Sequence, residues 1–230
     1  MKMVHMGRTG LQVGSVGFEL SPLKNRSYEE AARILQRAVD SGVTFFDIGL
    51  PCAEVQRRVG RGLGQIREKV VLAGSFIPST AQELERDLSA MLGDLKTEYL
   101  DILQIHDPDF LPRPGDGSGL FDALTKARGE GRIHHIGITT GNWEIAVKAL
   151  EYGWYDTLQY PWSRGSAEEE VSLLDFCLEA QVGSISVPPE EASEDLEADC
   201  RFLDERQDHV SLWLLDESMG FEQVLSWGKG

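Results

Sequence analysis

Residues 132–160 read RIHHIGITTGNWEIAVKALEYGWYDTLQY, and this stretch contains one complete structural unit. It begins with an apolar run of strand length, Arg132–Thr139, and ends with a second such run, Thr157–Tyr160. Between the two runs, Asn142 precedes a stripe of apolar residues at helical spacing that ends at Gly153. A helix between two short buried strands is the βαβ pattern, in which both strands lie parallel in one sheet.

The same alternation continues in both directions along the chain. Continuous apolar runs recur about every 25 to 30 residues, as expected for the strands of a barrel that are buried on both faces. The eight candidate strands are Val16–Leu20, Thr44–Ile48, Val70–Phe76, Leu100–His106, Arg132–Thr139, Thr157–Tyr160, Gly183–Val187 and Ser211–Leu215. We therefore predict an α/β fold, a single parallel (β/α)8 TIM barrel over residues 1–230. An open doubly wound sheet is the alternative.

Composition narrows the possible partners. The chain has 41% hydrophobic residues and a formal net charge of −16, which is expected to repel nucleic acid and anionic membranes. No apolar run reaches the roughly 18 residues of a membrane span. Three cysteines without metal-ligand spacing, and a start without an apolar leader, favour a cytoplasmic protein. A small molecule is the expected partner, and the sequence leaves the oligomeric state open.

Several stretches, in the correct order, resemble the aldo-keto reductases. Residues 6–13, MGRTGLQV, are similar to the opening hairpin of that family, and residues 42–47, GVTFFD, to its second strand, which ends in the catalytic aspartate. Residues 103–106, LQIH, resemble the fourth strand with the catalytic histidine. Residues 131–139, GRIHHIGIT, resemble the fifth strand, and Gln159 stands where the sixth offers an amide beneath the nicotinamide. The resemblance implies a compact barrel of the aldo-keto reductase type.

That resemblance also implies four catalytic side chains, of which this chain keeps two. Asp47 and His106 match the aspartate and the histidine that orients the carbonyl. Cys52 stands where the tyrosine that donates a proton is expected, and Ser75 where the lysine that activates the tyrosine is expected. The lysine implied by the resemblance carries a positive charge, and neither the thiol of Cys52 nor the hydroxyl of Ser75 can replace that charge. We therefore predict that the usual proton donor is lost. Cys52 is then either a nucleophile or a small residue that fills the space of the tyrosine.

The cofactor positions implied by the resemblance differ as well. Val187 stands near the position of the aromatic residue that stacks on the nicotinamide. Asp216 and Glu217 follow the last strand, where the family binds phosphate, and Glu19 ends the first strand near the pyrophosphate. A carboxylate that faces a phosphate at short range is unfavourable. We therefore expect no cofactor, and NADP(H) is the alternative.

Two hypotheses for the function follow. In the first, the barrel has a degenerate site that either performs a cofactor-free elimination, isomerisation or cyclisation through Asp47 and His106, or acts as a pseudoenzyme. In the second, it is an NADP(H)-dependent oxidoreductase with an altered proton donor. The residues predicted to bind the small molecule are Glu19, Trp143, Gln159 and Trp162. The predicted contacts to a cofactor are Thr139 and Asn142. A hard metal would suit the set Glu19, Asp47, His106 and Asp216, but nothing in the sequence brings them together, and no metal is predicted.

Overall fold

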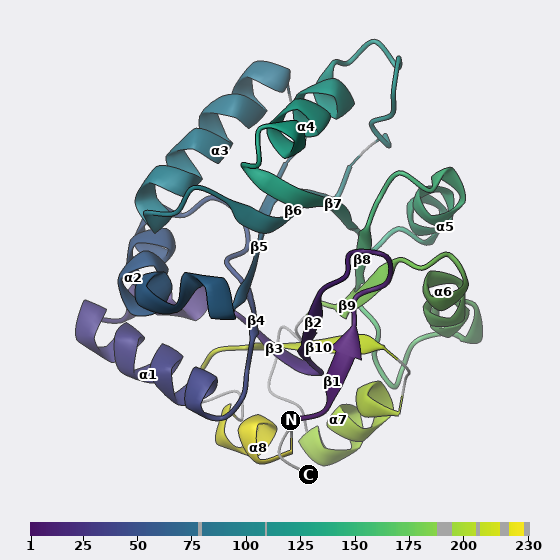
Figure 1. The fold of residues 1–230 in the computed structure, drawn as a ribbon. Coiled ribbons are helices and arrows are strands. Elements are labelled where there is room, and N and C mark those ends of the chain that lie inside the picture. The colour runs from purple at the N-terminus through teal and green to yellow at the C-terminus, as the bar shows by residue number, and fades with distance from the viewer. Residues whose placement is uncertain (78–79, 109, 188–194, 206–207, 217–220, 228–230) are drawn as a thin grey trace.

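The eight apolar runs form the strands of a closed parallel barrel in the computed structural model (Figure 1). The barrel strands are β3 Val16–Glu19, β4 Phe45–Asp47, β5 Val71–Phe76, β6 Leu100–His106, β7 Ile133–Thr139, β8 Thr157–Tyr160, β9 Gly183–Ser186 and β10 His209–Leu214. The structure describes residues 1–77, 80–108, 110–187, 195–205, 208–216 and 221–227. The predicted parallel barrel is confirmed.

Closure of the sheet excludes the open doubly wound alternative. The last strand, β10, pairs with β9 on one side and with the first strand, β3, on the other. In the second pairing Ser211 lies opposite Val16 and Leu214 opposite Glu19. All eight neighbouring pairs are parallel, so the carboxyl ends of all eight strands meet at one end of the barrel.

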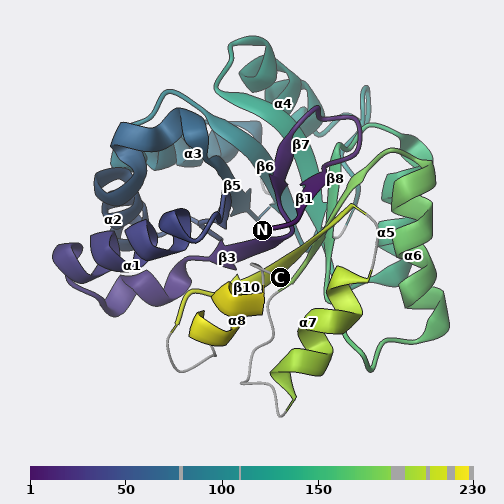
Figure 2. The same ribbon diagram turned by 60° about the horizontal axis from the view of Figure 1, so that its bottom comes forward.

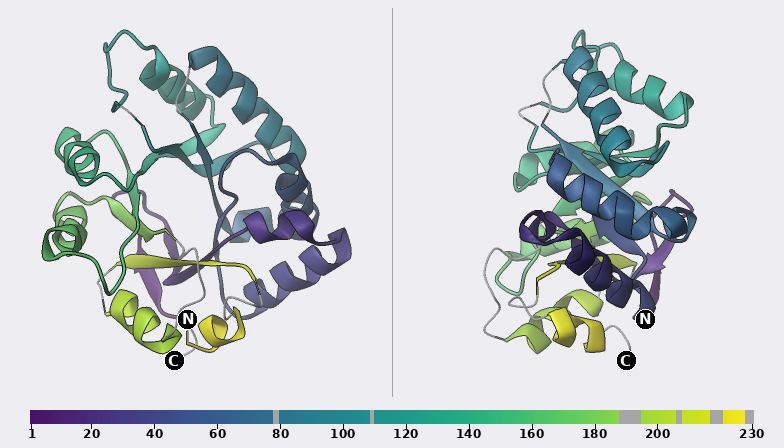
Figure 3. Two further views of the ribbon diagram at one scale, coloured as in Figure 1. Left: turned by 180° about the vertical axis from the view of Figure 1, so that it is seen from behind. Right: turned by 90° about the vertical axis from the view of Figure 1, so that its left-hand side faces the viewer.

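Helices follow the strands and surround the barrel, as Figures 2 and 3 show from other directions. The α-helices are α1 Tyr28–Asp40, α2 Ala53–Leu63, α3 Ala81–Leu95, α4 Leu120–Gly129, α5 Trp143–Tyr152, α6 Glu168–Glu179, α7 Leu196–Asp204 and α8 Phe221–Trp227. Two 3-10 helices are η1 Ser21–Asn25 and η2 Gly64–Lys69. Buried leucines and alanines of these helices pack on the outward-facing strand residues in one large cluster.

Capping side chains begin three of the helices. Ser27 begins α1 as a full capping box with Glu30, Thr80 accepts from the Glu83 amide, and Asn142 caps α5. The start of α6 differs, because the residue that precedes it is Ala167. Alanine has no oxygen to offer, and the cap is instead one-sided, with the Ala167 amide donating to the Glu170 carboxylate.

A hairpin covers the amino-terminal end of the barrel. It consists of β1 Met3–His5 and β2 Gln12–Gly14, which pair antiparallel. Val4, Met6 and Val13 are buried in the cluster that fills the barrel interior. Figure 2 shows β1 lying across the barrel, beside β3 and β10. With one end covered by this apolar plug, the carboxyl end is the one that can receive a ligand.

Cys177 and Cys200 are buried in the packing between barrel and helices. Across the described ranges, no helix combines the length and the apolar character that crossing a membrane requires.

Candidate active site

Inward-facing positions of the barrel change from apolar to polar at the carboxyl ends of the strands. Deeper inward residues, such as Phe45 and Leu212, belong to the interior apolar cluster. Side chains two positions further along a strand point the same way. The strand register then aligns one layer of polar residues at the barrel end, which we call the polar layer: Glu19 opposite Asp47, His106 opposite Thr139, and Thr139 opposite Gln159.

The polar layer opens into a cavity of about 430 Å³, which we call the mouth cavity. Its walls come from the ends of β3 to β9 and the segments that follow them. They are formed by Glu19, Ser21, Lys24, Asp47, Ile48, Gly49, Leu50, Pro51, Cys52, Val55, Ser75, His106, Thr139, Gln159 and Val187. Active sites of (β/α)8 barrels lie at this end, which makes the mouth cavity the candidate active site.

Asp47 lies at the centre of a hydrogen-bond chain through the polar layer. Its side chain is 3% exposed, and Oδ1 accepts from the Gly49 amide at 2.8 Å. Gln159 donates from Nε2 to the other carboxylate oxygen at 3.2 Å, while Oε1 of Gln159 accepts from the Thr139 hydroxyl at 2.8 Å. Burial raises the pKa of Asp47, and these hydrogen bonds and the nearby His106 oppose that rise. The chain of contacts fixes the Gln159 amide in one orientation.

His106 borders the same cavity but has a different carboxylate partner. Its side chain is partly exposed, and Nε2 lies 3.5 Å from Oδ2 of Asp107. In the described contacts, no hydrogen bond or ion pair joins His106 to Asp47. The expected acid/base pair is therefore two separate groups that share a cavity. The ring of His106 remains accessible to a ligand there.

Glu19, in the same polar layer, has hydrogen bonds and a pKa that could not be predicted from the sequence. Its Oε1 accepts from the Ser21 amide at 3.0 Å, and its Oε2 from the Ser21 hydroxyl at 2.7 Å. Burial raises the pKa of Glu19 to about 7, the negative charge of Asp47 adds to the rise, and the Ser21 contacts oppose it. Gly49, at φ +64°, gives the carboxylate room, because a Cβ there would lie 2.9 Å from Oε1.

Small side chains stand at the two positions where the family resemblance implies a tyrosine and a lysine. Cys52 is half-buried at the start of α2, and Ser75 is buried in β5. Both line the mouth cavity. The side chain of Cys52 does not cap its helix. Whether Cys52 acts as a nucleophile or only fills space stays a prediction.

Three predicted binding residues serve structural contacts outside the mouth cavity. Trp143 is 43% exposed and donates from its indole to the carbonyl of Glu169. Trp162 is buried and donates to the carbonyl of Glu170. The Asn142 side chain accepts two amides at the start of α5. None of the three belongs to the described wall of the mouth cavity, so the structure gives no support to their binding roles.

One cationic group lies beside a carboxylate that was predicted to repel phosphate. Asp216 follows β10, and its Oδ2 is 3.9 Å from the Arg26 guanidinium. Lys24, from η1, lines the mouth cavity. Glu217, the other carboxylate of that prediction, lies outside the described residues. Across the part of the chain that the structure describes, no group of three or more His, Cys, Asp or Glu residues is close enough to hold a metal.

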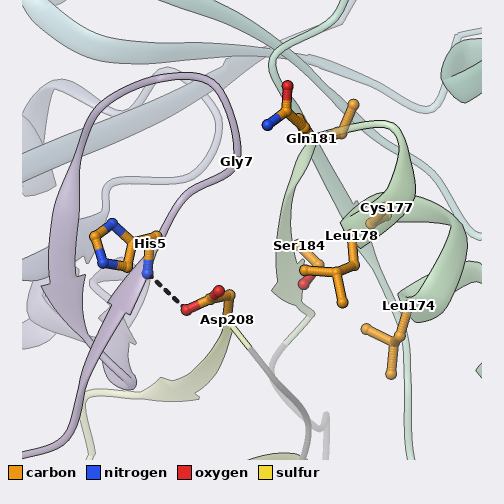
Figure 4. Close-up of a pocket in the computed structure, with 9 residues that line it drawn as sticks. His5, Gly7, Leu174, Cys177, Leu178, Gln181, Ser184 and Asp208 are labelled. Carbon is orange, nitrogen blue, oxygen red and sulfur yellow. Dashed lines mark hydrogen bonds between the residues drawn. The ribbon is translucent and has the colours of Figure 1, made fainter.

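A second cavity, of about 280 Å³, lies at the opposite end of the barrel (Figure 4). It is bounded by the hairpin and by α6, with Leu174 and Leu178 on one side and His5 on the other. The His5 amide donates to Oδ1 of Asp208 at 3.0 Å. Residues at the amino-terminal end of such barrels serve stability. We therefore take this cavity as part of the junction between hairpin and barrel.

The sequence and the fold are similar to known proteins. A model of the aldo/keto reductase family matches residues 10–189. L-galactose dehydrogenase of Arabidopsis thaliana is 28% identical over 206 residues, which are 80% of this chain and 64% of that protein. The 6-dehydroglucose reductase of Novosphingobium aromaticivorans is 25% identical over 154 residues, which are 58% of this chain and 50% of that protein. The chain thus spans one half to two thirds of the length of these relatives.

A solved aldo-keto reductase from Klebsiella pneumoniae, in complex with NADPH, has the same fold. It is 17% identical, with a TM-score of 0.82, over 98% of this chain and 90% of that one. The expectation that such a barrel has no cofactor is therefore wrong. Its physical basis also weakens, because the Asp216 carboxylate lies near a guanidinium. Cofactor-free chemistry has no counterpart in the names of the relatives, which are a dehydrogenase and a reductase.

Proposed function

Because this chain belongs to the aldo/keto reductase family, we propose that it is an NADP(H)-dependent oxidoreductase that interconverts a small carbonyl compound and its alcohol. The proposal includes a proton donor other than tyrosine, since Cys52 occupies the position implied for that residue. The observation that supports it most directly is the fixed Gln159 amide in the polar layer, held by Asp47 and Thr139 at the floor of the mouth cavity.

The residues present fit the nicotinamide end of the cofactor. Gln159 and Thr139 are 4% and 5% exposed, and they face a cavity of about 430 Å³. A primary amide has two N–H donors and two acceptor lone pairs, so Gln159 keeps one N–H and one lone pair for a carboxamide. Lys24 places positive charge in the wall of the cavity, in a chain of net charge −16. When bound, NADPH supplies the hydride.

The other residues of the polar layer suit the oxygen of a substrate. The ring of His106 can donate a hydrogen bond to a carbonyl oxygen and so orient it. Asp47 keeps Gln159 oriented and adds negative charge to the cavity. L-galactose and 6-dehydroglucose, named in the two relatives, are both sugar derivatives. This supports a polyhydroxylated carbonyl compound or alcohol as the substrate.

NADPH binding to the purified chain tests the proposal first. We expect quenching of tryptophan fluorescence on titration with NADPH and a rise in melting temperature, because a ligand that binds the native state stabilises it. Replacing the amide in Gln159→Leu should weaken NADPH binding about tenfold, the worth of one to two hydrogen bonds. Gln65→Leu, at an exposed position in η2, is the matched control and should leave the affinity unchanged.

Measurement of turnover is the second test of the proposed function. Aldehydes and ketones derived from hexoses, offered with NADPH, should cause a loss of NADPH absorbance that His106→Ala slows by about a hundredfold. Absence of NADPH binding by the wild type, in both fluorescence and melting measurements, would contradict the proposal.

A further inference from the structure

The mouth cavity contains few groups that could give a proton to a substrate oxygen. Asp47 is 3% exposed, and both of its carboxylate oxygens accept hydrogen bonds, from Gly49 and Gln159, so it is already engaged within the polar layer. Ser75 and Thr139 are hydroxyls, which are poor acids near neutral pH. Glu19 is the other carboxylic acid of the wall, it is half-buried, and it stands opposite Asp47 in the strand register.

We infer that Glu19 is the proton donor of this barrel, and that it replaces the tyrosine absent at position 52. The inference rests on the proposed NADP(H)-dependent function. Glu19 lines the same cavity as His106, Gln159 and Cys52, so its carboxyl group faces the space in which a substrate carbonyl would lie. The family resemblance gives position 19 no role in proton donation.

Charge around Glu19 favours the protonated acid near neutrality. Asp47 on β4 is the carboxylate across from it, and burial raises the pKa of Glu19 to about 7. Lys24 of η1 is a cationic group that lines the same cavity, and the imidazole of His106 on β6 lines it as well. Arg26 is near Asp216 at 3.9 Å, so its charge is shared with that carboxylate. An acid with a pKa close to the working pH is well suited to general acid catalysis.

Ser21 provides a route by which Glu19 can recover its proton. The Ser21 hydroxyl lies 2.7 Å from Oε2 of Glu19 and belongs to an exposed residue. A hydroxyl both donates and accepts, so it can relay a proton between the carboxyl group and water. Glu19 thus faces the cavity directly and can exchange a proton with water through the exposed Ser21.

In the proposed reduction, hydride and proton come from different donors. The C=O π bond of the substrate breaks, its carbon gains a hydride from the reduced nicotinamide cofactor, and its oxygen gains the proton of Glu19. The carbonyl compound is reduced by two electrons and NADPH is oxidised to NADP⁺. Glu19 becomes a carboxylate and takes up a proton from water through Ser21. In the reverse direction the Glu19 carboxylate removes the proton of the alcohol.

These roles predict opposite pH profiles for the two directions. Reduction needs protonated Glu19, so kcat/KM for the carbonyl compound should fall as the pH rises through about 7. Oxidation needs the carboxylate, so kcat/KM for the alcohol should rise through the same pH. Glu19→Gln should lose this ionisation in both directions and lower kcat by about a hundredfold or more. Glu151→Gln, on the exposed face of α5, is the matched control.

A readout without turnover separates this inference from the proposed function. Infrared difference spectra of the cofactor-free protein should show a protonated carboxyl band that disappears as the pH rises through about 7 and is missing in Glu19→Gln. Glu19→Asp, which keeps an acid, should retain part of the activity and guards against misfolding of the glutamine variant. Wild-type protein that fails to bind NADPH refutes the proposed function. NADPH-dependent turnover that survives in Glu19→Gln with an unchanged pH profile overturns the assignment of Glu19.

Discussion

Glu19 should affect the stability of the fold as well as its chemistry. Burial raises its pKa from 4.5 to about 7, so the native state holds a proton that the unfolded chain releases. The contribution of Glu19 to stability is then fully present below pH 4.5 and is lost as the pH rises to about 7, by at most about 3 kcal/mol. Asp47, whose pKa burial also raises, adds to this fall in the same direction.

We therefore expect Glu19→Gln to become more stable relative to wild type as the pH rises from 5 to 8. The substitution keeps the size of the side chain and removes the ionisation, so the difference isolates Glu19 from Asp47. Urea unfolding at several pH values measures the difference. A constant offset between the two proteins across this range would show that Glu19 titrates alike in the folded and unfolded states.

Helices α2 and α3 pack closely at a position where α2 has a glycine. Gly60 lies inside α2, and a Cβ at this position would come within 3.0 Å of Cα of Leu95 at the end of α3, with backbone atoms of Leu95 closer still. Backbone cannot move aside as a flexible side chain can. Gly93, inside α3, has nothing within 4 Å of the same ideal Cβ. The two positions form a matched pair for testing helix packing.

Gly60→Ala should destabilise the protein by about 1 to 3 kcal/mol, because α2 must shift away from α3. Gly93→Ala should instead stabilise it by about 0.5 to 1 kcal/mol, since alanine is the better helix former and meets no neighbour. Chemical unfolding of both variants checks the pair. Equal effects of the two substitutions would mean that helix propensity, and not the contact with Leu95, governs position 60.

The apolar runs predicted the barrel correctly, because strands that are buried on both faces are apolar along their whole length and are easily recognised in the sequence. Their ends were predicted less well. Leu20 and Leu215 were expected within strands but lie just beyond them, although their amides still donate to the carbonyls of Asp47 and Glu19. Apolar character continues into buried connections, so it does not mark where a strand ends.

The candidate site, too, could be predicted only in part from the sequence. Asp47 and His106 were found from their places at strand ends, which sequence order and resemblance both fix. The proton on Glu19 depends on burial and on contact with Asp47 and Ser21, which only the closed barrel creates. Trp162 was predicted as a binding residue, but its indole donates to a carbonyl outside the mouth cavity. Sequence spacing does not show in which direction a side chain points.

The closed barrel, plugged at one end and open at the other, should sort the three cysteines by reactivity. Cys52 is half-buried at the mouth cavity, whereas Cys177 and Cys200 are buried between barrel and helices. Burial raises the pKa of the Cys177 thiol to about 12, which leaves almost no reactive thiolate at neutral pH. In the native protein, a thiol reagent at pH 8 should therefore modify one cysteine rapidly. The other two should react at least about a thousandfold more slowly, because their exposure requires opening of the core.

Cys52→Ser should abolish the fast phase and leave the slow phase unchanged, and denaturant should make all the remaining thiols react together. Saturating NADPH should slow the modification of Cys52 in the wild type, since the proposed cofactor site and Cys52 share the mouth cavity. Rapid modification of all three cysteines in the native protein would contradict the packing of the outer helices. Unchanged labelling of Cys52 with NADPH bound would place the cofactor away from this cavity, and with it the chemistry that we assign to Glu19.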